Sequence, residues 1–135
     1  MKDAKLYRVM DANLNRAKEG LRVCEDICRF VYDQRQWTAG LKAVRHRLTA
    51  AAVGLGIPKL VAARHIEGDV GKKTVNSESA RRKVADIFYA NAQRVKESIR
   101  VLEEFAKLKD RRVAEDFKKL RYRVYALEKR IAAQS

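Results

Sequence analysis

Residues that break or cross-link a chain are scarce in this sequence of 135 residues, which contains one proline, six glycines and two cysteines. Proline and glycine are both unfavourable inside helices, so their scarcity is typical of a largely helical protein. Cys24 and Cys28 lie four residues apart on one helical face, which directs them wrongly for a disulfide, and two cysteines are too few for a zinc site. We expect two small core side chains in a reducing cytoplasm.

Long apolar runs and a catalytic histidine pattern are missing as well. No run approaches the roughly 20 residues of a membrane span, and the N-terminus lacks a signal-peptide core. The sequence therefore predicts a cytoplasmic protein with no membrane partner. Its two histidines, His46 and His65, form no Ser-His-Asp or Cys-His pattern, which disfavours nucleophilic hydrolysis.

Acidic residues are outnumbered, with 17 Asp and Glu against 31 Lys and Arg and a formal net charge of +14. Such a charge attracts polyanions, whether nucleic acid, an anionic membrane or phosphorylated small molecules. The charge is not gathered into a tail. Aromatic residues, which would stack on bases, are few, so charge alone does not choose among these partners.

The chain contains an internal repeat. Residues 11–30 match residues 89–108 at eight of twenty positions at an offset of 78, where one or two matches are expected by chance. The identities include an Asn, two Arg and two Glu at spacings of three, whereas the apolar positions are only similar. Conserved charges of this kind either support an exposed helix or build a duplicated polar site. A weaker match, at an offset of 76, relates Lys42, Arg45 and Arg47 to Lys118, Arg121 and Arg123.

Apolar spacing of three and four residues predicts four long helices. The first runs over about 4–33, with an apolar stripe at Leu14, Ala17, Leu21, Cys24, Cys28 and Val31. The others run over about 36–53, 77–109 and 113–132, with Ser77 as an N-cap. We predict a single all-α domain over 1–135, a four-helix bundle of two pseudo-repeated hairpins (about 4–53 and 77–132) joined by a glycine-containing loop, 54–76.

The loop contains Gly71-Lys72-Lys73-Thr74, which superficially resembles a phosphate-binding loop. It lacks the glycine four residues upstream, the Ser or Thr directly after the lysine, and a preceding strand, so we reject that motif. Glycines still permit close backbone approach, and Arg64, Lys72 and Lys73 can neutralise an anion. Asp69 is either a turn residue or a metal ligand or base beside that anion.

Arginines at duplicated positions, each near a duplicated glutamate, are the other chemical feature. Arginine forks suit phosphate and carboxylate oxygens, and paired glutamates can either hold the arginines in place or bind Mg²⁺.

Several stretches of the chain together resemble one helical family. The first reads Asp-Ala-Asn-Leu-Asn-Arg-Ala-Lys-Glu-Gly-Leu-Arg-Val, residues 11–23. The others are residues 41–46, 63–64 with 68–71, 90–94, 97–104 and 121–122. The family is the monofunctional hydroxymethylpyrimidine phosphate kinases of thiamine biosynthesis, found alone or fused N-terminally to thiamine phosphate synthase. The resemblance covers nearly the whole chain and departs from the family at His65, where an acidic residue is expected.

The resemblance implies ATP-dependent phosphorylation of hydroxymethylpyrimidine phosphate to the pyrophosphate, with ATP and Mg²⁺ as cofactors. The residues then expected to bind substrate and phosphates are Asn13, Arg16, Arg22, Arg45, Gly71, Lys72, Asn91, Arg94, Arg100 and Arg121. Arg64 and Asp69 are the candidate catalytic residues, and Glu19 and Glu97 the candidate Mg²⁺ ligands. Asn13 and Asn91 either read the aminopyrimidine edge or bond to their own helix. The expected partners are a phosphorylated pyrimidine, a nucleotide and thiamine phosphate synthase, with a homodimer plausible from the internal symmetry.

Other classes fit the composition. A basic helical bundle serves equally as a nucleic-acid-binding module or a non-catalytic adaptor. An all-α enzyme with an arginine-lined pocket for a dicarboxylate, of the chorismate mutase kind, is a third alternative. Nucleic-acid binding would fall steeply with salt and need no ATP.

Overall fold

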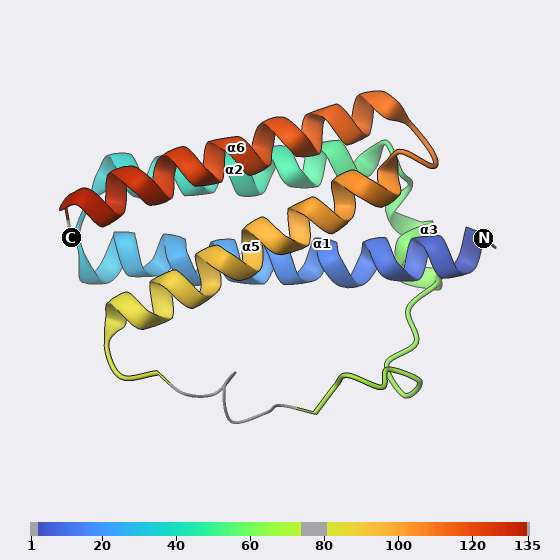
Figure 1. Ribbon diagram of the computed structural model, residues 1–135, viewed down its shortest axis with the longest axis horizontal. Coiled ribbons are helices and arrows are strands. Elements are labelled where there is room, and N and C mark those ends of the chain that lie inside the picture. The colour runs from blue at the N-terminus through green and yellow to red at the C-terminus, as the bar shows by residue number, and fades with distance from the viewer. Residues whose placement is uncertain (1–2, 74–80, 135) are drawn as a thin grey trace.

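The computed structural model describes residues 3–73 and 81–134, and within them the fold is helical without a strand. Helices α1 (Asp3–Asp26) and α2 (Arg35–Val53) form one hairpin, and α5 (Val84–Ala106) and α6 (Arg111–Gln134) form the other. A short helix, α3 (Ile57–Ala62), follows α2. The predicted all-α bundle of two hairpins is confirmed (Figure 1).

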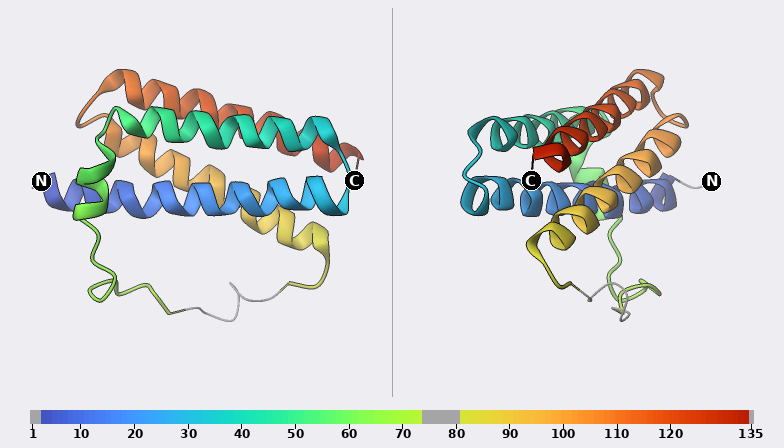
Figure 2. Two further views of the ribbon diagram at one scale, coloured as in Figure 1. Left: turned by 180° about the vertical axis from the view of Figure 1, so that it is seen from behind. Right: turned by 60° about the vertical axis from the view of Figure 1, so that its left-hand side comes forward.

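The two hairpins pack so that equivalent helices meet. α1 packs on α5 and α2 packs on α6, while each hairpin holds its own two helices together. The segment after α3 runs along the α1/α5 side of the bundle, away from α2 and α6, in both views of Figure 2. This places the loop beside the repeated stretch, which lies on α1 and α5.

The core is made by the apolar stripes of all four long helices. Phe117, Met10, Leu21, Leu48 and Ile99 are among its fully buried members. Burial of such side chains contributes roughly 1.5–3 kcal/mol each and is what holds these amphipathic helices together.

The predicted stripe fails at Val31, which is 53% exposed. The end of the first helix is a π-helix, η1 (Ile27–Val31), in which the Tyr32 amide donates to the Ile27 carbonyl at 3.0 Å. The wider turn rotates the face that follows it, so the spacing of three and four no longer points inward. Asp33, with φ of +52°, then reverses the chain into α2.

The third long helix begins later than predicted, and the proposed cap at Ser77 lies outside the described residues. Lys83 is extended, and Asp86 accepts the amides of Lys83 at 3.0 Å and of Arg82 at 3.3 Å. This carboxylate satisfies amides that the first turn leaves without partners, which sets the start of α5 at Val84. The helix also ends at Ala106, three residues before the predicted Lys109.

Candidate functional site

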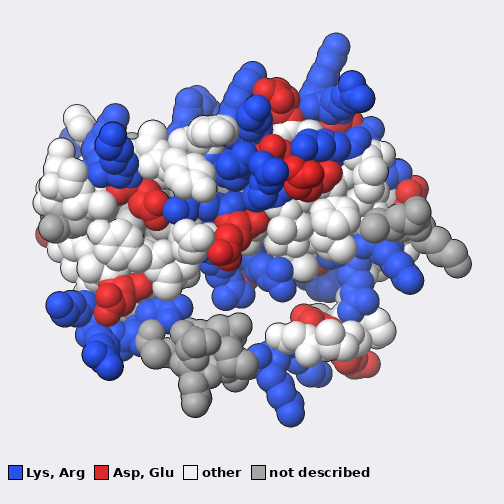
Figure 3. Space-filling model, viewed as in Figure 1, with Lys and Arg blue, Asp and Glu red and all other residues white. Residues whose placement is uncertain are grey.

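A cleft of about 1240 Å³ lies between α1, α5 and the segment 64–73. Figure 3 shows it as a hollow between the helices and the loop, with Lys and Arg side chains around it. Among the residues that the structure describes, its charged lining comprises seven basic and four acidic residues: Lys5, Arg8, Arg16, Arg64, Lys72, Lys73 and Arg94, with Asp11, Glu19, Asp69 and Glu97. The excess of positive charge suits an anionic ligand.

The internal repeat meets itself in this cleft. Arg16 and Glu19 reach it from α1, and their repeat partners Arg94 and Glu97 reach it from α5. All four residues are exposed, so their side chains are not buried in the core and can contact a ligand. One cleft therefore presents two arginines and two glutamates, one pair from each half.

A close helix crossing brings the two halves together. A Cβ added at Gly20 would lie 2.7 Å from Val95 Cγ2 and 3.1 Å from the Asn91 carbonyl oxygen. Its repeat partner is Ser98, another small residue, which is buried and lines the cleft. Small residues at both equivalent positions let the α1 and α5 backbones approach each other.

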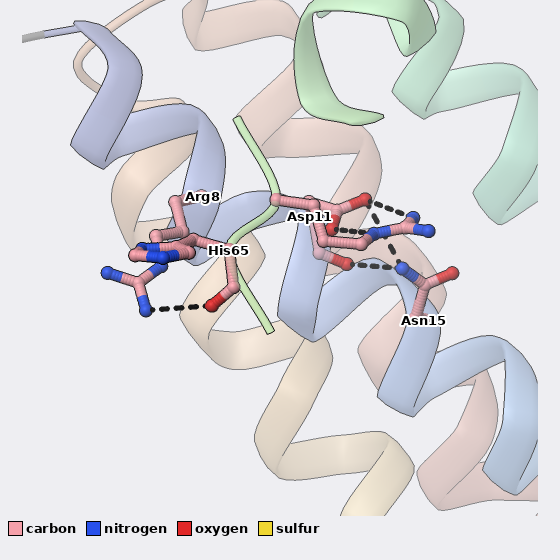
Figure 4. Close-up of polar contacts among 5 residues, drawn as sticks. Arg8, Asp11, Asn15 and His65 are labelled. Carbon is pink, nitrogen blue, oxygen red and sulfur yellow. Dashed lines mark hydrogen bonds and ion pairs between the residues drawn. The ribbon is translucent and has the colours of Figure 1, made fainter. Parts of the chain in front are cut away.

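The loop is fastened to α1 by a buried carboxylate. Arg64 donates from Nε and Nη2 to Asp11 Oδ2 and Oδ1 at 2.8 and 2.9 Å, and Asp11 is only 4% exposed. Asn15 Nδ2 donates to the same Oδ1 at 3.2 Å, and Arg8 Nη2 donates to the His65 carbonyl at 3.2 Å (Figure 4). The hydrogen bonds and charge of Asp11 raise the pKa of Arg64. Arg64 is thus held as a fixed cation at the cleft wall, with Nη1 donating to no acceptor among the described residues.

The predicted loop residues Asp69, Gly71 and Lys72 also line the cleft. Asp69 Oδ1 accepts the Gly71 amide at 2.9 Å, which is the hydrogen bond of an Asx turn. The other carboxylate oxygen, Oδ2, accepts no hydrogen bond from a described residue. Asp69 is therefore a turn residue, which is one of the two roles predicted for it. Its other predicted role, as a base or metal ligand, stays a prediction.

The two repeated asparagines bond to their own helices. Asn13 Nδ2 donates to the Val9 carbonyl at 2.9 Å, and Asn91 Nδ2 donates to the Ile87 carbonyl at 2.8 Å. Asn13 lines the cleft, and its Oδ1 accepts from Arg16 Nη1 at 3.4 Å, whereas Asn91 is not part of the lining. The amide group of each asparagine is therefore partly engaged before any ligand arrives.

Two repeated arginines lie elsewhere and hold buried glutamates. Arg45 Nε donates to Glu25 at 2.9 Å between α2 and α1, and Arg121 Nε donates to Glu103 at 3.0 Å between α6 and α5. The side chains of Glu25 and Glu103 are 4% and 5% exposed. These equivalent ion pairs tie each hairpin together, so the repeat conserves part of its charge for structure.

Arg22 and Arg100 flank those same glutamates at 3.8 and 3.7 Å, and both side chains are 54% exposed. Neither lines the cleft, and nor do Arg45 and Arg121. Phosphate binding by these four arginines stays a prediction without support from the geometry.

The cleft carboxylates could hold Mg²⁺ only together with ligands from outside the protein, such as phosphate oxygens and waters. Within 3–73 and 81–134, no group of three or more His, Cys, Asp or Glu could hold a metal ion by itself. Glu19 and Glu97 nevertheless share the cleft, and Gln93 Nε2 orients Glu97 Oε2 at 3.0 Å. Mg²⁺ is usually bound by one or two carboxylates together with substrate phosphates and waters. Two glutamates beside a phosphate fit that donor set.

Sequence reasoning missed Lys5, Arg8, Asp11 and Asn15 as site residues. Lys5, Arg8, Asp11, Asn15 and Glu19 are spaced three or four residues apart and share one helix face, so the face itself was a usable signal. The face did not reveal that Asp11 pairs with Arg64, which is distant in sequence. No described helix has the combination of length and apolar character that crossing a membrane requires.

Comparison with known proteins confirms the link to a thiamine-biosynthesis family over almost the whole chain, whereas the kinase activity stays a prediction. The sequence model of the ThiD2 family matches residues 8–130. A thiamine-phosphate synthase of Nostoc punctiforme is 40% identical over 124 residues, covering 91% of this chain and 34% of that protein. The Synechocystis thiamine-phosphate synthase is 43% identical over 124 residues, covering 91% and 35%. That of Rhodopirellula baltica is 36% identical over 122 residues, covering 90% and 32%.

The chain therefore spans about a third of the length of these curated relatives. No solved structure matches it.

Proposed function

This chain belongs to the ThiD2 family, and from that premise we propose that it is an ATP-dependent kinase that converts hydroxymethylpyrimidine phosphate to the pyrophosphate in thiamine biosynthesis. The names of the relatives support the pathway, since each is a thiamine-phosphate synthase. The observation that carries the reaction class is the cleft in which Arg16, Glu19, Arg94 and Glu97 converge. A thiamine phosphate synthase is the partner that would consume the product.

The chemical task is to bring two anions into contact. Two unit charges 4 Å apart repel by about 4 kcal/mol at an effective dielectric constant of 20. A nucleotide triphosphate and a phosphate monoester each carry several charges, so the site must offset many such terms. Arg16 on α1 and Arg94 on α5, which line the same cleft, would bind oxygens of the two reactants and hold them together.

The transfer itself needs little acid–base chemistry. A bond forms between an oxygen of the substrate phosphate and the γ-phosphorus of ATP, while the bond from that phosphorus to the bridging oxygen breaks and ADP leaves with the electron pair. The attacking oxygen is already deprotonated near neutral pH, since the second pKa of a phosphate monoester is about 6. A strong general base is unnecessary, and the cleft supplies positioning and positive charge.

Glu19 and Glu97 would hold Mg²⁺ against the phosphates, and Mg²⁺ would supply neutralisation of the charge that develops on them. Arg64 contributes a cation whose position is set by Asp11. His65 stands where an acid was expected, but its carbonyl is what Arg8 contacts. That contact uses the backbone, which any residue at position 65 would provide.

The test is ADP formation with Mg²⁺-ATP and hydroxymethylpyrimidine phosphate, with the unphosphorylated alcohol as the control substrate. We expect turnover with the phosphate and little with the alcohol, which lacks the anion that the cleft binds. Arg16→Ala and Arg94→Ala should each lower kcat/KM by 100-fold or more, because charged hydrogen bonds to a transferring phosphoryl group are lost.

Arg47→Ala and Arg123→Ala are matched controls, because they form another repeated arginine pair, exposed on α2 and α6 outside the cleft. They should retain turnover within twofold. A folded wild-type protein that turns over neither substrate would refute the proposal.

A further inference from the structure

The two helices contribute unequally to the charge of the cleft. Of the seven basic residues that line it within the described parts of the chain, six come from α1 and the loop, and Arg94 comes from α5. Three of the four acidic lining residues, Asp11, Glu19 and Asp69, also come from α1 and the loop, and Glu97 comes from α5. The described lining therefore carries six basic and three acidic residues on α1 and the loop, and one of each on α5. A duplication that had kept two equivalent sites would present equal charge from both helices.

The asymmetry has a structural cause. The repeat counterparts of Lys5 and Arg8 are Lys83 and Asp86, which close the N-terminal turn of α5 and do not line the cleft. The counterpart of Asp11 is Tyr89, so α5 has no carboxylate at the position from which Asp11 binds Arg64 on α1. At these positions the second copy lacks the residues that give α1 its basic wall and its contact with the loop.

The cleft is also long and large enough for two ligands. Its volume of about 1240 Å³ exceeds the roughly 300–1,000 Å³ of an ordinary ligand pocket. Along α1, Lys5 and Arg16 both line it, and their separation in sequence corresponds to about 16 Å of helix. Figure 1 shows α3 and the start of the loop beside the N-terminal part of α1, where Lys5 and Arg8 lie.

We propose that the triphosphate of the nucleotide lies along α1 and the loop, against Lys5, Arg8, Arg64 and Lys72, while Arg94 on α5 binds the phosphate of the second substrate. This rests on the proposed function. A triphosphate carries three to four negative charges and a monoester about 1.5 to 2, so the more highly charged reactant is assigned to the wall with the excess of basic residues. The two halves then form one shared site of two unlike subsites, and each chain binds one nucleotide.

The first test measures binding and needs no catalysis. Inorganic tripolyphosphate is titrated into the wild-type protein and into Lys5→Ala, Lys72→Ala and Arg94→Ala by calorimetry at low salt. We expect one tripolyphosphate per chain, affinity reduced at least fivefold by Lys5→Ala or Lys72→Ala, and a change below twofold for Arg94→Ala. Two equal sites per chain, or a larger loss from Arg94→Ala than from Lys5→Ala, would overturn the assignment.

The second test divides the kinetic effects. Arg94→Ala should raise the KM for hydroxymethylpyrimidine phosphate at least tenfold with the KM for ATP little changed, and Lys5→Ala should do the reverse. The opposite pattern overturns the assignment of subsites. If the wild-type protein shows no turnover, the proposed kinase fails, and the tripolyphosphate titration still decides which wall binds a polyanion.

Discussion

The crossing of α1 and α5 at Gly20 determines how close the two arginine-bearing walls of the cleft can be, and Gly20→Ala perturbs it directly. An added Cβ would lie 2.7 Å from Val95 Cγ2 and 3.1 Å from the backbone oxygen of Asn91. The valine methyl belongs to a branched, buried side chain, and the oxygen belongs to a helix. Neither can withdraw alone, so α5 must shift as a body away from α1.

Two opposing effects set the magnitude. Replacing glycine with alanine in the middle of a helix stabilises it by about 1 kcal/mol through backbone entropy. Overpacking a tight contact costs about 1–3 kcal/mol, and here the upper half of that range applies because backbone is involved. We expect a net loss of about 1–2 kcal/mol in the free energy of unfolding. At roughly 3–5 °C per kcal/mol for a domain of this size, Tm should fall by about 3–10 °C.

Gly40→Ala is the matched control within the same protein. Its Cβ would also meet an atom at 2.7 Å, but that atom is Leu127 Cδ2, and the next contacts at 3.5 and 3.7 Å belong to the same side chain. A leucine end can change rotamer, so the helix-propensity gain should offset most of the packing cost, leaving stability within about 1 kcal/mol of the wild type.

Urea unfolding and calorimetry on the three proteins measure this difference. Gly20→Ala should also lose kcat/KM, since displacing α5 moves Arg94 relative to Arg16. A Gly20→Ala protein as stable as the wild type, or less affected than Gly40→Ala, would refute the tight α1–α5 crossing.

Three further outcomes are expected. Arg45→Ala or Arg121→Ala leaves a buried glutamate without its main partner and should cost about 2–4 kcal/mol in urea unfolding, a little below the range for fully buried pairs because another arginine stands nearby. Burial raises the pKa of Cys24 to about 12 and of Cys28 to about 11, so both thiols should stay protonated at pH 8 and react with a thiol reagent such as DTNB only as fast as the protein unfolds. Asp11→Asn removes the charge that holds Arg64, so trypsin should cleave the segment 64–73 several times faster, as measured by mass spectrometry of the fragments.

Each outcome has its own control. Arg22→Ala, whose side chain is 54% exposed and 3.8 Å from Glu25, should lose under 1 kcal/mol, and an equal loss for Arg45→Ala would contradict the structural pairing. For the thiols, urea-unfolded protein is the positive control, in which Cys24 and Cys28 should both react with DTNB. Immediate reaction of either thiol in the native protein would contradict its burial. Asp116→Asn, on exposed α6, should leave the tryptic rate unchanged, and an unchanged rate in Asp11→Asn as well would show that the loop is not held by Asp11.

The fold followed from the sequence wherever a single periodic pattern governed a helix. The α6 stripe, with Phe117 and Leu120 among its members, is buried as its spacing predicts. The pattern failed at Val31, because a π-turn needs only one extra residue and leaves no mark in composition. It failed again before α5, because one carboxylate, Asp86, determines where the helix starts.

The candidate site was predicted in part: some of the repeated residues line the cleft, and others form structural ion pairs. Arg16, Glu19, Arg94 and Glu97 are gathered in one cleft, as a duplicated polar site requires. Arg45 was grouped with them because it repeats, but a repeat preserves structural ion pairs as well as ligand contacts. Distinguishing the two needs the packing of α2 on α1, which places Arg45 against Glu25.

The contact between Asp11 and Arg64 could not be predicted either. It joins a helix to a loop, and neither residue has a repeat partner of the same type to draw attention to it. The tertiary structure alone shows that Asp11, the first residue of the stretch 11–23, holds the loop that lines the cleft.

The central claim is that phosphates bind between α1, α5 and the loop, and an NMR titration of backbone amides tests it most directly. Mg²⁺-ATP and hydroxymethylpyrimidine phosphate are added in turn to isotopically labelled protein. The account predicts shifts that cluster in residues 5–19, 64–73 and 94–101, with α2 and α6 little affected. Shifts confined to the outer face of α2 and α6, around Arg47 and Arg123, would contradict it.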